Sequence, residues 1–248
     1  LHRRSAEVDR ARSAFSNALN CARRSGDSRT LSATLNNLAA LEHDQARFAR
    51  AEELFIEAME LCISQQHELA AATSQLNLGT INLERGLLDR ARAFYAQALA
   101  TFEQNQDQSY TAIIEALLGL VELDQGQTRE AKNKLDRAAA SATVSEDLLV
   151  QTMSECWHGV GHWLEGEDEA AYLRLRNAAG LMKRQKNPKS LAFVYGYYGA
   201  ILAQRGRASE AREKFRLGRY LMQQSNNRNH LDALKVLVGV AAAALARE

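Results

Sequence analysis

An internal repeat of 40 residues constrains the fold of this chain more than any other feature. Each copy holds an alanine, a large side chain four residues later and a small side chain three residues after that. Spacings of four and three place these side chains on one face of an α-helix, and the small ones allow another helix to approach closely. The alanines are Ala11, Ala51, Ala91, Ala131, Ala171 and Ala211, and the large side chains are Phe15, Phe55, Tyr95, Leu135, Leu175 and Phe215.

A second helix in each repeat is marked by two columns of glycine. Glycine inside a helix costs about 0.5–1 kcal/mol relative to alanine, so its recurrence predicts a close crossing with the partner helix. The first column contains Ala39, Gly79, Gly119, Gly159, Gly199 and Gly239, preceded by Leu38, Leu78, Leu118, His158, Tyr198 and Val238. The second column, Gly86, Gly126, Gly166 and Gly206, predicts the tight turn between the two helices.

A further column marks the helix starts. It contains Asp27, His67, Asp107, Asp147, Asn187 and Asn227, and all of these except His67 are residues favoured at N-caps. Pro188 follows Asn187 at the first helical position. The register predicts a half repeat at 8–25, full repeats at 29–66, 68–106, 108–143, 147–185 and 188–225, and a half repeat at 228–247. Within the full repeats the helices are predicted at 29–45, 48–66, 68–85, 88–106, 108–125, 128–143, 147–165, 168–185, 188–205 and 208–225.

Repeats of this kind bury their apolar faces only by stacking on their neighbours. The sequence therefore predicts an all-α fold: one right-handed α-solenoid of about six helix pairs, or twelve antiparallel helices, forming a single domain over 1–248. A single proline and 6% aromatic residues argue against a sheet protein. Both ends carry unfinished repeats and the chain does not begin with Met, so we expect a piece of a longer protein.

Composition narrows the functional classes. The net charge of +1 provides no global field to attract nucleic acid or an anionic membrane, and the longest apolar run, 236–246, is too short to span a bilayer. Cys21, Cys62 and Cys156 are widely spaced in helical patterns, so we expect small buried thiols in a cytoplasmic protein rather than a disulfide framework. We find no phosphate-binding loop, nucleophile elbow or Cys–His pair at a recognisable spacing, which argues against an enzyme or a cofactor site.

The residues Leu78-Gly79, Gly86, Ala91, Tyr95 and Ala98, repeated at Leu118-Gly119, Gly126, Ala131, Leu135 and Ala138, resemble the tetratricopeptide repeat family. The period is 40 residues where the commonest form has 34, and the aromatic residue of the family pattern is absent at Asn82, Glu122 and Leu202. Longer repeats of this kind resemble those of kinesin light chains and of bacterial regulators such as the maltose activator and the Rap phosphatases. The resemblance implies binding of peptides, proteins or small ligands on the concave surface made by the first helix of each pair.

Two groups of residues are predicted to face that concave surface. The first group lies in the first half of the chain and is polar: Asn36, Asn37, Asn77, Thr80 and His43. These side chains could hold a peptide backbone by hydrogen bonds, and the alternative is that they are simply solvated in an exposed groove. Family members that clamp a C-terminal carboxylate need Lys and Arg beside such asparagines, but Leu76, Ala116, Leu117 and Leu120 stand there, which disfavours binding of chaperone tails.

The second group is aromatic and contains Trp157, Phe193 and Tyr197. These rings are either binding anchors in the groove or filler of wider repeat junctions. His158 and His162 have the i, i+4 spacing of a helical metal pair, but both fall in columns that face the partner helix, so we expect core histidines and no metal site.

The sequence thus predicts a non-catalytic binding module, the sensor or interaction region of a bacterial signalling protein or transcription regulator. The alternative is a stand-alone scaffold or assembly factor, in secretion or pilus biogenesis, that binds a polypeptide in its groove. The expected partner is a protein or peptide, or a small-molecule effector, with no nucleic-acid or membrane contact by this region. The apolar last helix, at 228–247, suggests self-association there.

Overall fold

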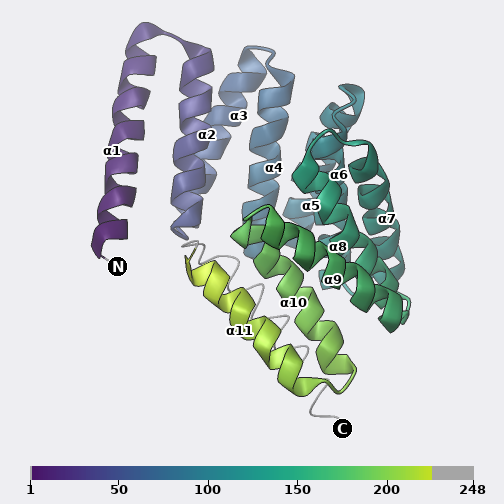
Figure 1. The fold of residues 1–248 in the computed structure, drawn as a ribbon. Coiled ribbons are helices and arrows are strands. Elements are labelled where there is room, and N and C mark those ends of the chain that lie inside the picture. Colours follow the sequence, from purple (N-terminus) through teal and green to yellow (C-terminus); the bar gives the residue numbers. More distant parts are fainter. Residues whose placement is uncertain (1, 225–248) are drawn as a thin grey trace. The chain divides into compact units, whose positions relative to one another are not determined.

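The computed structural model describes the backbone of residues 2–224, which form eleven α-helices and no strand (Figure 1). The helices are α1 (His2–Ser25), α2 (Ser28–Asp44), α3 (Phe48–Ser64), α4 (Glu68–Glu84), α5 (Leu88–Gln104), α6 (Gln108–Asp124), α7 (Thr128–Val144), α8 (Leu148–Leu164), α9 (Asp168–Arg184), α10 (Pro188–Gln204) and α11 (Ala208–Gln224).

The predicted helix boundaries are confirmed to within two residues for α2–α11. The first helix begins at His2 rather than at residue 8, because the residues before the alanine column continue the helical pattern. The predicted twelfth helix at 228–247, the cap Asn227 and the suggested self-association lie outside the described residues. None of the described helices is long and apolar enough to cross a membrane.

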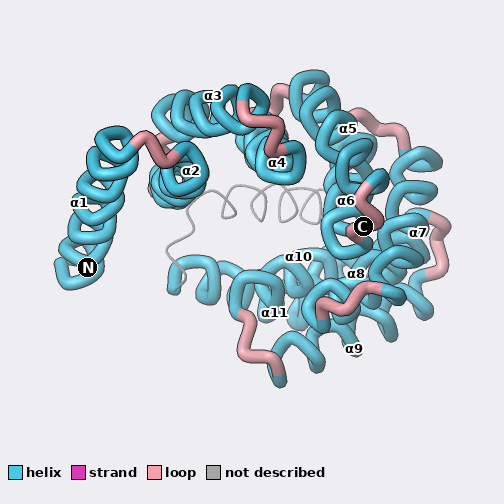
Figure 2. The backbone as a smooth tube through the Cα atoms, turned by 90° about the horizontal axis from the view of Figure 1, so that it is seen from above, coloured by secondary structure: helices cyan, strands magenta, loops and turns pink. Residues whose placement is uncertain are grey.

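The chain divides into two compact units, Leu1–Asn105 with α1–α5 and Gln106–Glu248 with α6–α11. Within each unit, consecutive helices are joined by short loops and pack side by side in antiparallel pairs (Figure 2). Both units are therefore built from the same helix-pair repeat, and the all-α solenoid architecture is confirmed.

Four of the predicted N-caps make the expected hydrogen bonds. The side chains of Asp27, Asp107, Asp147 and Asn187 each accept a backbone N–H from the first turn of the following helix. His67 makes no such bond at the start of α4. The helix starts are thus set by side chains that satisfy otherwise unpaired backbone donors.

The glycine column marks helix crossings, as predicted. A Cβ atom on Gly79 would lie 2.5 Å from the ring of Tyr95, and one on Gly199 would lie 2.8 Å from the ring of Phe215. The turn column has a different cause: Gly86 has φ +72°, and a Cβ there would meet nothing within 4 Å. Close approach therefore selects glycine in the first column, and left-handed backbone selects it in the second.

Candidate functional site

A cavity of about 270 Å³ lies in the second unit, between the first helices of three successive pairs, α6, α8 and α10. Trp157, Phe193 and Tyr197, the three aromatic residues predicted for the groove, all line it. The other lining residues are mostly aliphatic: Ile113, Ala116, Leu117, Leu120, Leu135, Leu149, Val150, Met153, Cys156, Val160 and Ser190.

Helical periodicity explains how these side chains meet. On α6, Ile113, Leu117 and Leu120 are spaced four and then three residues apart, which places them on one stripe of the helix. The same argument relates Ser190 to Phe193 and Tyr197 on α10, and Met153 to Trp157 on α8. Three parallel helices therefore present matching apolar stripes to one space.

Trp157 and Tyr197 take part in both the cavity and the core. Each packs against a buried cluster that includes Ala116, Leu135 and Val160, and each is partly exposed where it faces the cavity. Neither the indole N–H of Trp157 nor the hydroxyl of Tyr197 has a hydrogen-bond partner in the described part of the chain. Both rings are therefore held in place by packing and leave part of their surface facing the cavity.

The surroundings of the cavity disfavour charge. Burial raises the pKa of the Tyr197 phenol, and the neighbouring Cys156 and Asp124 raise it further. Burial also raises the pKa of the Cys156 thiol to about 12, so this thiol stays protonated at neutral pH. The lining therefore suits an apolar group.

Two of the three cysteines are the small buried residues that the sequence predicts, namely Cys62 and Cys156. For Cys21 the prediction is wrong, because this side chain is exposed. The buried residues near it on α1 are Leu19 and Ala22, and Cys21 lies on a different face of the helix.

The first unit has a polar trough of about 650 Å³ between α2 and α4, and Asn36 and Asn37 line it. The amide of Asn36 is already engaged: its Nδ2 donates to the carbonyl of Ser32 at 3.1 Å, and its Oδ1 accepts from the hydroxyl of Ser74 at 3.0 Å. Asn37 is exposed. Of the two asparagines, Asn37 is thus the one able to hold a peptide backbone.

The other polar residues predicted for the groove do not line this trough. The hydroxyl of Thr80 donates to the carbonyl of Leu76 at 3.0 Å and accepts from the hydroxyl of Tyr95 at 3.3 Å, so Thr80 faces α5. Asn77 is half-buried. His43 is paired through Nε2 with Glu84 at 2.9 Å. The structure therefore brings together Asn36 and Asn37 but not the rest of the polar group.

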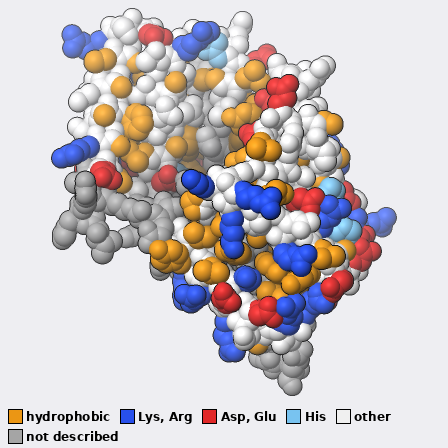
Figure 3. All heavy atoms as spheres, viewed as in Figure 1, with side chains coloured by type: hydrophobic (Ala, Val, Ile, Leu, Met, Phe, Trp, Pro, Cys, Tyr) orange, Lys and Arg blue, Asp and Glu red, His pale blue; other side chains and the backbone are white. Residues whose placement is uncertain are grey.

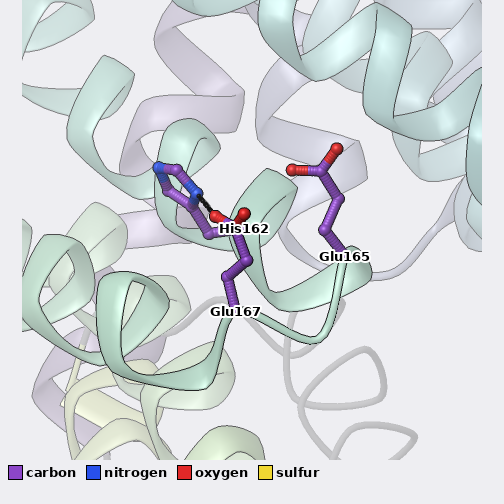
Figure 4. Close-up of side chains that lie close together, drawn as sticks. All are labelled: His162, Glu165 and Glu167. Atoms are coloured by element: carbon purple, nitrogen blue, oxygen red, sulfur yellow. Dashed lines mark hydrogen bonds and ion pairs between the residues drawn. The ribbon is translucent and has the colours of Figure 1, made fainter.

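A second cluster of titratable residues contains His162, Glu165 and Glu167 at the end of α8 (Figure 4). Their potential ligand atoms lie within 4.8 Å of one another. Nδ1 of His162 is 2.6 Å from Glu167, and Glu165 is 3.2 Å from the ammonium group of Lys132. A cation there would have to displace the hydrogen-bonded contact between His162 and Glu167 and the ion pair between Glu165 and Lys132, so we interpret the cluster as a structural tie between helices.

The prediction of a core histidine is wrong for His162, whose side chain is 32% exposed and pairs with Glu167. His158 is half-buried, and its Nδ1 is enclosed without a hydrogen-bond partner in the described residues. Burial lowers the pKa of His158, and the nearby Arg174 lowers it further. His158 is therefore neutral at pH 7, as expected of an imidazole that packs in a leucine column.

Lys and Arg side chains gather over α9–α11, interspersed with hydrophobic and acidic ones (Figure 3). Three of the guanidinium groups surround the ring of Tyr172: those of Arg176, Arg205 and Arg207 lie 6.0, 5.3 and 5.1 Å from its centroid. Arg205 pairs with Glu169, and Arg207 with Glu210. These three guanidinium groups are thus engaged in cation–π contacts, and two of them also in ion pairs, within the repeats.

The sequence comparison agrees with this architecture. Residues 31–64 and 71–104, which fall in the pairs α2–α3 and α4–α5, match the tetratricopeptide repeat family model. These two segments are tetratricopeptide repeats. No curated protein sequence matches the chain.

Solved structures share the tetratricopeptide-like fold over most of the chain. BtubC from P. vanneervenii is 19% identical with a TM-score of 0.63, and the match covers 88% of this chain and 92% of BtubC. The Rap conjugation gene regulator of plasmid pLS20, solved in complex with the Phr* peptide, is 16% identical with a TM-score of 0.69. That match covers 87% of this chain but only 60% of the regulator. NprR in complex with its cognate peptide NprX is 16% identical with a TM-score of 0.67, and the match covers 91% and 67%.

Proposed function

We propose that the chain is a non-catalytic, peptide- or protein-binding repeat domain spanning 1–248, and that it is the sensor or interaction region of a bacterial, cytoplasmic signalling protein or transcription regulator. The observation that carries the proposal is the cavity where Trp157, Phe193 and Tyr197 meet on the first helices of successive pairs. Aromatic anchors in largely desolvated pockets dominate the energetics of most interfaces. The fold likeness to the Rap regulator of pLS20 and to NprR, both solved with a bound peptide, supports this proposal.

The second candidate is a stand-alone scaffold that binds a polypeptide constitutively. The likeness to BtubC favours it, since the match covers 92% of that protein. The full-length gene separates the two candidates: a DNA-binding or kinase domain in the same chain supports the regulator, and a lipobox or signal peptide supports the scaffold.

The binding role is tested by selecting peptides from a random library on the full chain and measuring their affinities for variants. We expect Trp157→Ala and Tyr197→Ala to weaken binding of the selected peptides at least tenfold, because interface anchors cost about 2 kcal/mol or more on truncation. Tyr220→Ala is the matched control, since this tyrosine is 56% exposed on α11 and does not line the cavity.

Thermal melts of the same variants identify the alternative role. If the two rings are junction filler, both truncations lower the melting temperature by several degrees while the affinity per folded molecule stays unchanged. That pattern, or a selection that yields no specific peptide, would contradict the proposed function.

A further inference from the structure

Asp124 extends the apolar stripe of α6 that lines the cavity. It lies four residues after Leu120, and Ile113, Leu117, Leu120 and Asp124 are spaced four, three and four residues apart along one face of the helix. Building on the proposed function, we propose that the cavity takes an apolar side chain of a peptide ligand and that Asp124 binds a positive charge on the same ligand. Four residues of helix, a rise of about 6 Å, separate Leu120 from Asp124.

The cavity admits a side chain but not a peptide backbone. Its lining offers few hydrogen-bonding groups, chiefly the hydroxyls of Tyr197 and Ser190 and the indole N–H of Trp157. A buried backbone amide without partners costs several kcal/mol, so the chain of the ligand must pass outside. A dry apolar cavity of about 150 Å³ already holds benzene. The volume of about 270 Å³ therefore suits a ring or a branched aliphatic group with a short stem.

Asp124 is a carboxylate without a compensating cation. It makes no hydrogen bond or ion pair within the described part of the chain, whereas the buried acids Glu42 and Glu115 each pair with two basic side chains. Its side chain is reachable by solvent, and neighbouring protein atoms still raise its pKa by desolvation. A positive charge on a ligand would offset the cost of this desolvation by its attraction to the carboxylate.

The aromatic rings add to the same preference. The faces of Trp157, Phe193 and Tyr197, which line the cavity, attract a cation, as aromatic quadrupoles do. The carboxylate of Asp124 and these rings therefore both favour a positive group over a neutral or a negative one at the edge of the apolar cavity.

Three small probes of the same shape test the charge preference: 4-phenylbutylamine, 4-phenylbutanol and 4-phenylbutyrate. Binding to the ¹⁵N-labelled full chain is followed at the indole N–H signals. The chain has two tryptophans, and Trp157→Phe assigns the signal of Trp157. We expect the amine to bind about two- to fivefold more tightly than the alcohol, as partly exposed ion pairs do, and the acid to bind most weakly. The preference should shrink in 0.5 M NaCl.

Three variants separate the parts of the proposal. Asp124→Asn should abolish the difference between amine and alcohol, whereas Glu213→Gln, at an exposed acid on α11, should leave it intact. Ala116→Leu fills the cavity and should weaken all three probes. Equal binding of amine and alcohol to the wild-type chain overturns the role of Asp124 while leaving peptide binding, measured with the library peptides, in place.

Two other results overturn the inference entirely. If library peptides bind but none of the probes shifts the Trp157 signal, the cavity is not the binding site for an apolar group. If light scattering shows concentration-dependent self-association that Ala116→Leu abolishes, the occupant is a second copy of this chain rather than a peptide.

Discussion

Nδ1 of His162 lies 2.6 Å from a carboxylate oxygen of Glu167, in the same two columns of the repeat that Glu42 and Arg47 occupy 120 residues earlier. Glu42 and Arg47 are 2.8 Å apart, with the acid and the base exchanged relative to the later pair. Both pairs join the end of a first helix to the start of the second helix of the same repeat. In these two repeats, the column where the family pattern has an aromatic ring thus holds a polar tie.

The exchange of charges can be tested by reversing it. We expect His162→Glu combined with Glu167→Arg to restore the arrangement of Glu42 and Arg47 and to leave the free energy of unfolding within about 0.5 kcal/mol of wild type. The single variant His162→Glu places two acids together and should destabilise the fold by up to about 1 kcal/mol. Urea unfolding of the singles and the double gives the coupling energy, and a coupling near zero would show that the pair is incidental.

If the cluster at His162 is only a structural tie, Zn²⁺ should not bind to it specifically. Titration with ZnCl₂ should give the same weak response for wild type and for His162→Gln. A saturable site lost in that variant would instead establish a metal site on His162, Glu165 and Glu167.

Substitution by alanine should have opposite effects at a helical glycine that lies against a neighbouring side chain and at one that faces open space. Gly79→Ala forces a Cβ against the ring of Tyr95, so we expect a loss of about 1–3 kcal/mol from overpacking. Gly180 lies inside α9 with nothing within 4 Å of a built Cβ, so Gly180→Ala should stabilise by about 0.5–1 kcal/mol. Denaturant melts measure both values. Destabilisation of similar size at both positions would refute the crossing argument.

Among the five positions of the N-cap column that the structure describes, only His67, at the start of α4, makes no capping hydrogen bond. His67→Asp should add a bond to the first turn of α4 and stabilise the fold by about 0.5–2 kcal/mol. Asp107→Ala removes the bond to the backbone N–H of Tyr110 and should cost a similar amount. Thermal melts of the two variants should shift in opposite directions.

The helices could be predicted from the sequence because their signals are local and recur. Gly79, Asp107 and Ala131 mark a crossing, a cap and a small face in fixed register, and six copies of each column reduce the chance of error. The aromatic cavity could be predicted in part, since Trp157 and Tyr197 share a column that faces the groove.

The polar residues of the first unit are harder to predict, because hydrogen bonding depends on neighbours that no column shows. Asn36 and Thr80 fall near the groove positions, but Ser74 and Tyr95 engage their side chains. Asp124 is absent from the predicted site residues because its carboxylate ends an otherwise apolar stripe. The signal that could have found it was the helical spacing from Leu120.

His158 should make the fold sensitive to mild acid. It stands in the column of Leu38, Leu78 and Leu118, and burial holds its pKa below the usual value near 6.5. Arg174 and His162 also oppose its protonation, while Glu155 and Asp136 favour it. Because the unfolded chain binds this proton more readily than the folded chain, the free energy of unfolding should fall as the pH drops below about 6.5.

Substitution removes both the titration and the enclosed, unpaired Nδ1. We expect His158→Leu to stabilise the fold at pH 7.5, since it restores the residue of the column and leaves no unsatisfied nitrogen. The gain should be larger at pH 5.5, where the wild-type chain loses stability through His158 and the variant does not. Urea melts of both proteins at the two pH values give this difference directly, with other titrating groups common to both. An equal gain at the two pH values would show that His158 has the same pKa in the folded and the unfolded chain, as a freely hydrated imidazole does.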